Sequence, residues 1–324
     1  MKPLSDAALA HLQRLADTPN LSGTRYTVVE EVGRGGMGAV YRARDTVLGR
    51  DVALKVIRTP DLPQPLAARL AQEARILARL EHPGIVPVHD LGALPDGRTY
   101  YVMKLVRGRR LDAWLAAGRS LRERLDLLLR VAEAVAFAHA HGVIHRDLKP
   151  ANIMVGEFGE VLVLDWGVAK LMEKGEKAEK GEKGEKGEEG NGGSSVVHTD
   201  HGTVLGTRGY MAPEQESGQV ELVDERADVF ALGALLGTLA GEEAPRRLRA
   251  IAARATARTR EQRYASAPAF AKEIARFLDG EPVDAYRETV LERAGRLSVK
   301  YRTPLLLVLA YLVMRMVFII VSGR

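Results

Sequence analysis

The order of strand-like and helix-like segments constrains the fold of this chain more than any other feature. From Arg25 to about Val106 the sequence is mostly strand-like, with RYTVVEEV, AVYRARD, DVALKVI and TYYVMKL separated by turns containing glycine or proline. One predicted helix, from about Pro65 to Glu81, interrupts them. After Gly108 the pattern is helical, apart from the short apolar strands NIMV and VLVLD. This order favours an α+β chain, and 324 residues are enough for two packed lobes or one large domain.

The clearest predicted helix runs from Ser120 to His141. Ser120 and Glu123 have the spacing of a capping box, and Gly142 follows where a helix-terminating glycine belongs. A second helical region extends from Asp224 to Leu278.

Composition excludes several classes of protein. The chain contains no cysteine, which rules out a disulfide scaffold, cysteine metal sites and thiol catalysis. The net charge of +5 is not arranged as a basic stripe with interleaved aromatic residues, so we expect no nucleic-acid partner. The N-terminal segment is too polar for a secretory signal peptide.

A glycine-rich string, GRGGMG at residues 33–38, matches G-x-G-x-x-G. The same string occurs in dinucleotide-binding folds, where it opens a helix. Here it is followed by the strand-like Ala39-Val40-Tyr41-Arg42. A glycine hairpin between two strands can lay its backbone N–H groups over phosphates. The sequence therefore favours a phosphate-binding hairpin over a dinucleotide-binding loop that opens a helix.

Lys55 and Glu73 are a candidate ion pair. Strand alternation places Lys55 on the same face as Ala53. Glu73 falls on the apolar stripe of its predicted helix, where a carboxylate costs several kcal/mol unless it is paired. Lys55 is therefore the expected partner, although a surface lysine is the simpler alternative.

The string HRDLKPAN, residues 145–152, follows the capped helix directly. Together with the glycine loop, VALK, a D-x-G and APE in this order, it resembles the catalytic segments of eukaryotic-like (Hanks-type) Ser/Thr protein kinases of bacteria. The resemblance covers about residues 26–279. It implies a bilobal protein-kinase fold, with an antiparallel sheet and one helix in the N-lobe and a mainly helical C-lobe.

The resemblance also implies a division of the chain. We expect an N-terminal helical extension at 1–24, the N-lobe at 25–106 and the C-lobe at 107–279. A disordered Lys/Gly/Glu insert at 173–195 would lengthen the activation segment. A basic juxtamembrane linker at 280–303 and a transmembrane helix at 304–321 would follow.

What the resemblance implies for the chemistry is transfer of the ATP γ-phosphoryl group to Ser or Thr hydroxyls of protein substrates. Asp147 would orient the hydroxyl and take its proton, and Lys149 would neutralise charge on the γ-phosphate. Asn152 and Asp165 would hold Mg²⁺. Lys55, held by Glu73, would bind the α- and β-phosphates.

The nucleotide would be held by both lobes. Met103 would be the gatekeeper, and residues 104–106 would be the hinge that reads the adenine edge. The expected ATP-binding residues are Val32, Gly33, Arg34, Gly35, Gly36, Met37, Gly38, Ala39, Val40, Ala53, Lys55, Glu73, Met103, Lys104, Val106 and Met154.

Regulatory and bracing roles follow from the same resemblance. Arg146 would pair with a phosphorylated residue of the activation segment, and autophosphorylation is expected at Thr199 or Thr203. Thr207 would contact the catalytic loop. Asp228 would brace that loop from a buried helix. Separately, Glu214 of APE would pair with Arg263 in the lower lobe.

Two departures from the family pattern leave an alternative open. Trp166 replaces the usual phenylalanine of D-F-G, and a large aromatic ring can fill the same apolar slot. After Leu239 the helix that normally contributes to substrate docking is missing. A membrane-tethered pseudokinase that binds ATP without efficient transfer is therefore the alternative. A small-molecule kinase is disfavoured by the complete APE segment.

The apolar segment from Leu305 to Val321 is broken only by Arg315. Its 17 residues are near the lower limit for a membrane span, and a buried globular helix is the competing interpretation. Arginines and a lysine precede it, which predicts a single-pass protein of the cytoplasmic membrane with the kinase in the cytoplasm. Homodimerisation through this helix is left open.

Overall fold

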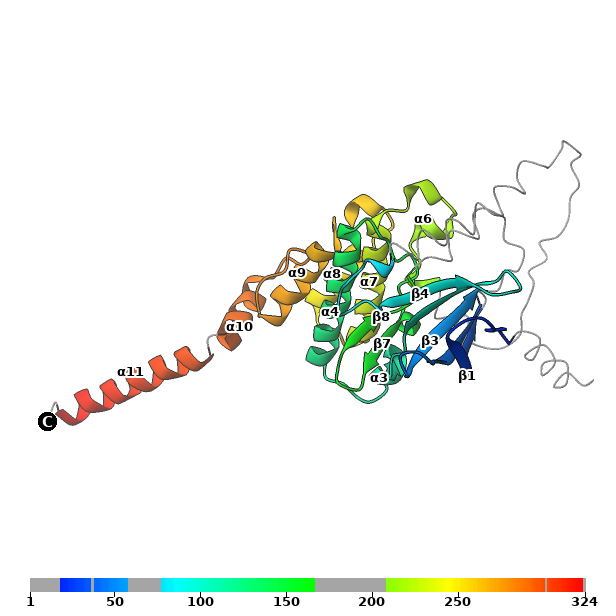
Figure 1. The fold of residues 1–324 in the computed structure, drawn as a ribbon. Helices are drawn as coiled ribbons and strands as arrows, with labels where there is room; N and C mark the ends of the chain where they lie inside the picture. The colour runs from blue at the N-terminus through cyan, green and yellow to red at the C-terminus, as the bar shows by residue number, and fades with distance from the viewer. Residues whose placement is uncertain (1–17, 36–37, 58–76, 167–207, 301, 323–324) are drawn as a thin grey trace, which may run out of the picture.

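A computed structural model describes residues 18–35, 38–57, 77–166, 208–300 and 302–322. Figure 1 shows a sheet-based lobe, a helical lobe and two C-terminal helices that extend away from both. Most of the predicted N-terminal extension, nearly all of the helix from Pro65 to Glu81 and the Lys/Gly/Glu insert lie outside the described residues. The described residues form the two lobes that were expected, one built on an antiparallel sheet and one mainly helical.

The N-terminal lobe is built on a five-stranded antiparallel sheet of order β1-β2-β3-β5-β4. The four predicted strands form. The sequence analysis did not predict β4, because its VHDLGA sequence contains glycine and aspartate, which are poor strand formers. The strands are β1 Tyr26–Gly35, β2 Gly38–Asp45, β3 Arg50–Ile57, β4 Val88–Ala93 and β5 Thr99–Lys104.

The two faces of this sheet bury different side chains. Val52, Leu54 and Val56 of β3 belong to a small cluster on the outer face. Ala53 of the same strand belongs to the main core, which continues into the helical lobe. This alternation was expected from the period of two, and it turns Ala53 and its neighbour Lys55 toward the junction between the lobes.

The C-terminal lobe contains most of the helices and a small antiparallel sheet of order β6-β7-β8. Its sheet comprises β6 Gly108–Arg110, β7 Ile153–Gly156 and β8 Val161–Val163. Its α-helices are α3 Leu111–Leu115, α4 Leu121–Ala140, α6 Pro213–Glu216, α7 Glu225–Ala240, α8 Arg246–Ala255 and α9 Ala267–Leu278. Short 3₁₀ turns are η1 Pro150–Asn152, η2 Arg208–Tyr210, η3 Val220–Leu222 and η4 Arg260–Gln262.

Helix α4 forms as predicted, with both halves of the capping box. The Ser120 side chain accepts from the Glu123 N–H, and the Glu123 carboxylate accepts from the Ser120 N–H. Gly142 ends the helix with φ of 74°, a conformation that glycine adopts without strain. An N-terminal cap such as Ser120 contributes about 1 kcal/mol to the free energy of unfolding.

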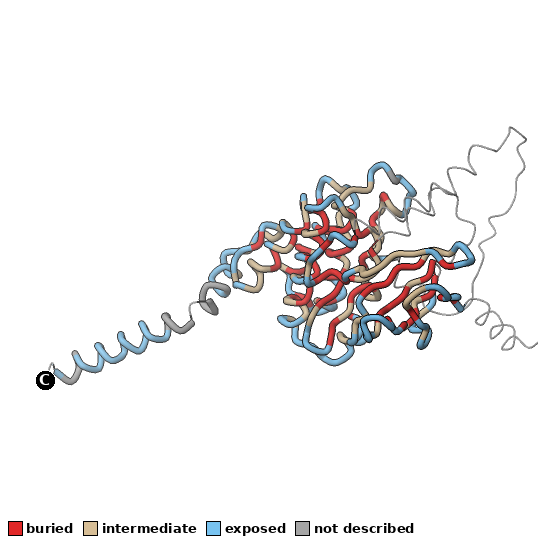
Figure 2. The backbone as a smooth tube through the Cα atoms, viewed as in Figure 1, coloured by how far each residue is buried: buried red, intermediate tan, exposed pale blue. Residues whose placement is uncertain are grey.

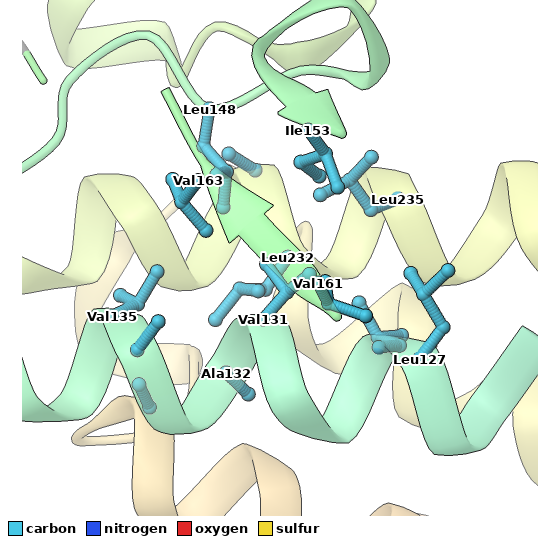
Figure 3. Packing of buried hydrophobic residues seen from close by; sticks show 14 of the residues in the cluster. Leu127, Val131, Ala132, Val135, Leu148, Ile153, Val161, Val163, Leu232 and Leu235 are labelled. Atoms are coloured by element: carbon cyan, nitrogen blue, oxygen red, sulfur yellow. The ribbon is translucent and has the colours of Figure 1, made fainter. Parts of the chain in front are cut away.

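The core of the lower lobe lies between α4, α7 and the β7–β8 hairpin. Figure 3 shows Val131 and Val135 on the side of α4 that faces Leu232 of α7 and Val161 and Val163 of β8. Figure 2 shows this buried zone running through the centre of the lobe. Leu148 of the loop predicted from HRDLKPAN and Ile153 directly after it are buried in this core, which anchors the loop.

A very short connection joins α7 to α8. Helix α7 ends at Ala240 and α8 begins at Arg246, so only residues 241–245 lie between them. No further helix therefore lies between Leu239 and α8 in this described stretch of the chain. The core beneath it remains closed, because Leu239 and Leu248 are both fully buried.

The C-terminal region forms two helices, α10 Val290–Lys300 and α11 Arg302–Ser322. The large apolar side chains from Leu306 to Phe318 are exposed, and Figure 2 shows the described part of α11 exposed along its length. Within the described parts of the chain, no helix has the length and apolar character needed to cross a membrane. The predicted transmembrane helix is therefore not confirmed.

Candidate active site

The glycine-rich string joins two strands and does not open a helix. β1 ends at Gly35 and β2 begins at Gly38, and these two residues pair at the tip of the hairpin. Gly38 has φ of 143°, and a Cβ there would collide with the Val56 carbonyl. Only glycine fits this position, which agrees with a phosphate-covering hairpin and excludes the dinucleotide-binding arrangement. Gly36 and Met37 lie outside the described residues.

Lys55 projects from β3 into the junction between the lobes. Its Nζ lies 2.6 Å from Asp165 Oδ1, and its side chain is only 13% exposed. Burial would lower the pKa of Lys55, but the neighbouring Tyr101 and Asp165 outweigh burial and raise it, so the ammonium stays charged. The predicted partner Glu73 lies outside the described residues, and the pairing with Asp165 was not predicted from the sequence.

The catalytic loop is held by one buried carboxylate. Asp228 of α7 accepts from the His145 N–H at 2.7 Å and from the Arg146 N–H at 2.9 Å. Its Oδ2 also lies 2.8 Å from His139 Nε2. Burial would raise the pKa of Asp228, but the hydrogen bond from His139 and the charge environment hold it below its ordinary value. The carboxylate therefore stays ionised and fixes the loop backbone.

Three polar side chains converge at the end of this loop. Lys149 Nζ lies 3.0 Å from Asp147 Oδ2. The Asn152 amide donates to Asp147 O at 2.8 Å and to Asp147 Oδ2 at 3.2 Å. The structure thus brings together the three residues that the sequence analysis proposed as catalytic.

His145 organises the turn beside them. Its Nδ1 accepts from the Asp147 N–H at 3.2 Å, and its Nε2 donates to Leu164 O at 2.9 Å. Burial lowers the pKa of His145, which fits the neutral ring that these two bonds require. Trp166 packs against this ring at 4.8 Å between centroids and is 6% exposed, so it occupies an apolar slot as expected.

Backbone strain is concentrated at the same place. Among the described residues, Arg146 and Asp165 are the non-glycine residues with positive φ, at 65° and 52°. Such conformations cost about 1–3 kcal/mol each and are retained where the surroundings require them. Asp228 holds the first through its backbone N–H, and Lys55 holds the side chain of the second.

The residues expected to hold Mg²⁺ fit that ion. Asp165 offers a carboxylate. The Asn152 amide nitrogen donates to Asp147, so the Asn152 amide oxygen is left to act as a metal ligand. Magnesium is usually bound by one or two such oxygen ligands together with substrate phosphates. In the described parts of the chain, no cluster of three or more acidic or histidine ligands forms an all-protein metal site.

Several of the residues expected to surround adenine lie on strands that border the junction between the lobes. Ala53 and Met103 are cross-strand neighbours on the inner face of the sheet. Met154 lies on β7, opposite Arg110 of β6. The Lys104 N–H donates to Pro87 O at 3.1 Å, which fixes the start of the expected hinge. Val40 and Val106 are partly buried against the same core, whereas Val32 is exposed and Arg34 pairs with Glu31.

The APE segment is locked to the lower lobe. The Arg263 guanidinium donates to both Glu214 oxygens, at 2.7 and 2.8 Å, and both side chains are buried. Gln215, which the sequence analysis did not single out, donates to Arg146 O at 2.9 Å and links this segment to the catalytic loop. Thr199, Thr203 and Thr207 lie outside the described residues.

Comparison with known proteins identifies the same architecture. The family model described as protein kinase domain matches residues 26–280. A probable serine/threonine-protein kinase of Streptomyces coelicolor is 36% identical over 230 residues, 68% of this chain and 30% of that protein. Serine/threonine-protein kinase PknA of Mycobacterium tuberculosis is 39% identical over 220 residues, 66% of this chain and 46% of that protein.

A solved structure agrees with these matches. The Mycobacterium tuberculosis PknI kinase domain has a TM-score of 0.56 and 26% identity, and it covers 80% of this chain and 98% of that domain. The matched region spans less than half the length of both curated relatives.

Proposed function

This chain belongs to the protein kinase family, in its bacterial Hanks-type branch, and from this premise we propose that it is a Ser/Thr protein kinase. It transfers the γ-phosphoryl group of ATP to Ser or Thr hydroxyls of protein substrates. The observation that carries the proposal is the set of charged and amide side chains at the end of the catalytic loop. Asp147, Lys149 and Asn152 meet there, and Lys55 is paired with Asp165 in the same junction between the lobes.

Asp147 is proposed to orient the acceptor hydroxyl and take its proton. Lys149, 3.0 Å from the Asp147 carboxylate, is placed to neutralise charge on the transferred group. The hydroxyl oxygen bonds to the γ-phosphorus as the bond from that phosphorus to the bridging oxygen breaks. The reaction needs positioning and charge neutralisation more than covalent help, and the rigid bracing by Asp228 supplies the positioning.

Lys55 is proposed to bind the α- and β-phosphates. Its ammonium stays charged, and Asp165 holds it until the nucleotide is present. Asp165 and Asn152 would hold Mg²⁺, which would neutralise charge on the phosphates. The inner face of the sheet, at Ala53 and Met103, and Met154 below would enclose the adenine.

Regulation by phosphorylation belongs to the same proposal. Arg146 is fixed beside Asp147 by its backbone bonds to Asp228 and Gln215, so it is placed to receive a phosphorylated residue of the activation segment. We place the autophosphorylation site at Thr199 or Thr203. Phosphopeptide mapping followed by alanine substitution of both residues tests this, and unchanged activity of the double variant contradicts it.

The direct test of the proposal is phosphoryl transfer by the full chain. Wild-type protein, Mg²⁺ and γ-labelled ATP are incubated with a generic acceptor protein, and the modified amino acids are identified. Phosphoserine or phosphothreonine is expected from the wild type and absent from Asp147→Asn. Nucleotide binding without any transfer by the wild type would overturn the proposal in favour of a pseudokinase that only binds ATP.

A further inference from the structure

Tyr101 of β5 lies directly beside the phosphate-binding lysine. β3 and β5 pair so that Lys55 is opposite Tyr101. Side chains opposite each other in an antiparallel pair leave the sheet on the same face, with Cβ atoms about 5 Å apart. The Lys55 Nζ lies 5.8 Å from the centroid of the Tyr101 ring. Tyr101 is only 9% exposed, so the ring and the ammonium meet in a region with little water, where a side-chain hydrogen bond joins Tyr101 to Lys55.

The chemistry of the two groups fixes the direction of this contact. A lysine ammonium has three donors and no acceptor, so the phenol oxygen acts as the acceptor. Burial raises the pKa of Tyr101, which keeps the hydroxyl neutral. Asp165 Oδ1, at 2.6 Å, interacts with the same ammonium nitrogen of Lys55.

These contacts restrict a long and flexible side chain. A lysine has four rotatable bonds and loses rotamer entropy when it is held in one position. With Tyr101 and Asp165 as fixed partners, much of that entropy is already lost before the nucleotide arrives. If Asp165 binds Mg²⁺, Tyr101 would remain beside the ammonium as a second protein partner.

We propose that Tyr101 is a positioning residue that holds the Lys55 ammonium toward the phosphates of the nucleotide. This inference rests on the proposed function of Lys55 as the phosphate-binding residue. Its consequence is specific, because the hydroxyl should matter for ligands that carry phosphates and should not matter for the adenosine part alone.

The neighbouring Tyr100 provides a matched control. It precedes Tyr101 on the same strand, is 6% exposed and points to the opposite face of the sheet. There its ring packs edge-on against Tyr26, at 6.4 Å between centroids. Tyr100→Phe and Tyr101→Phe therefore remove the same atom from the same strand, and only the second removes it from beside Lys55.

The experiment is calorimetric titration of the full chain with ADP and with adenosine, each in the presence of Mg²⁺. Because Tyr101→Phe removes a hydrogen bond to a charged group, it is expected to weaken ADP binding about tenfold, which corresponds to about 1.4 kcal/mol. Adenosine binding should not change. Tyr100→Phe should bind both ligands as the wild type does, and Tyr101→Phe should cause no further loss of ADP affinity in a Lys55→Met background.

The outcomes separate this inference from the proposed function. Failure of the wild type to bind ADP would contradict the proposed kinase activity itself. Normal or tighter ADP binding by Tyr101→Phe, with a wild type that binds, would overturn only the role of Tyr101. An equal loss of ADP and adenosine affinity would show a general packing defect, and this too would overturn the positioning role.

Discussion

Removal of the Arg263 side chain is expected to cost more stability than most single changes in the lower lobe. Its guanidinium is fully buried and donates to both Glu214 oxygens, at 2.7 and 2.8 Å. It also donates to the Ala257 and Arg226 carbonyls and lies 5.0 Å from the centroid of the Phe230 ring. Arg263→Met keeps much of the packing volume but leaves a buried carboxylate without its partner.

Breaking a buried pair in this way costs about 3–5 kcal/mol. For a domain of this size, each kcal/mol corresponds to about 2–4 °C in Tm, so a fall of about 10 °C is expected. Thermal and urea unfolding followed by circular dichroism measure the change. Arg249→Met is the control, because Arg249 is an exposed arginine of α8, and changes at such positions usually stay within about 0.5 kcal/mol.

The pH dependence gives this prediction a second check. Burial alone would raise the pKa of Glu214, but the hydrogen bonds from Arg263 hold it below its ordinary value of 4.5. In the wild type the carboxylate therefore contributes stability above pH 4.5, which is lost as the pH falls through the lower folded value. Without Arg263, burial favours the protonated acid. The difference in unfolding free energy between wild type and Arg263→Met should therefore be largest near neutrality and shrink on acidification.

The double variant Glu214→Leu/Arg263→Met should be more stable than Arg263→Met alone, because it contains no unpaired buried charge. A loss below about 1 kcal/mol in Arg263→Met, or a gap that grows on acidification, would refute this reasoning, since a buried unpaired charge must cost more.

Three further predictions follow from the contacts of the lower lobe. Ser120→Ala removes the cap of α4 and should cost about 1 kcal/mol in urea unfolding, whereas no loss would mean that the capping box contributes nothing. Trp166→Phe removes the indole hydrogen bond to Val163 O at 3.2 Å and should lower the free energy of unfolding by about 1 kcal/mol. ADP binding should not change, and a loss of ADP affinity would contradict a purely structural role of the indole. Asp228→Ala leaves the N–H donors of the catalytic loop, including that of Arg146, without their acceptor. It should lower the free energy of unfolding by about 3 kcal/mol and abolish phosphoryl transfer. Near-normal transfer kinetics in a folded variant would contradict the bracing role.

Much of the fold could be predicted because local and long-range signals agree. The period of two in β3 correctly assigned its faces, and the spacing from Ser120 to Glu123 located the start of α4. β4 was missed because its composition is unlike that of a strand, and its pairing with β5 is a long-range contact that the local sequence does not show. For α11 the hydrophobic run correctly predicted a helix. The run alone does not determine whether that helix lies in a membrane, and the predicted transmembrane helix is not confirmed.

The candidate site was predictable where a short motif contains both partners. Asp147, Lys149 and Asn152 lie within six residues of each other, so their meeting follows from one loop. Contacts across long separations depended on the family resemblance, as with Glu214 and Arg263, or were missed. Tyr101 was missed because the doublet of two tyrosines only predicts a strand, and the register of β3 against β5 decides which ring faces Lys55. The roles assigned to these residues stay predictions.

One measurement tests the central claim most directly: single-turnover transfer of the γ-phosphoryl group from labelled ATP, with nucleotide binding measured on the same samples. Wild type, Asp147→Asn and Lys55→Met are compared. The account predicts transfer to serine or threonine by the wild type, transfer lost with ADP binding retained in Asp147→Asn, and weakened ADP binding in Lys55→Met. Equal transfer by wild type and Asp147→Asn, or no transfer by a wild type that binds nucleotide, would contradict it.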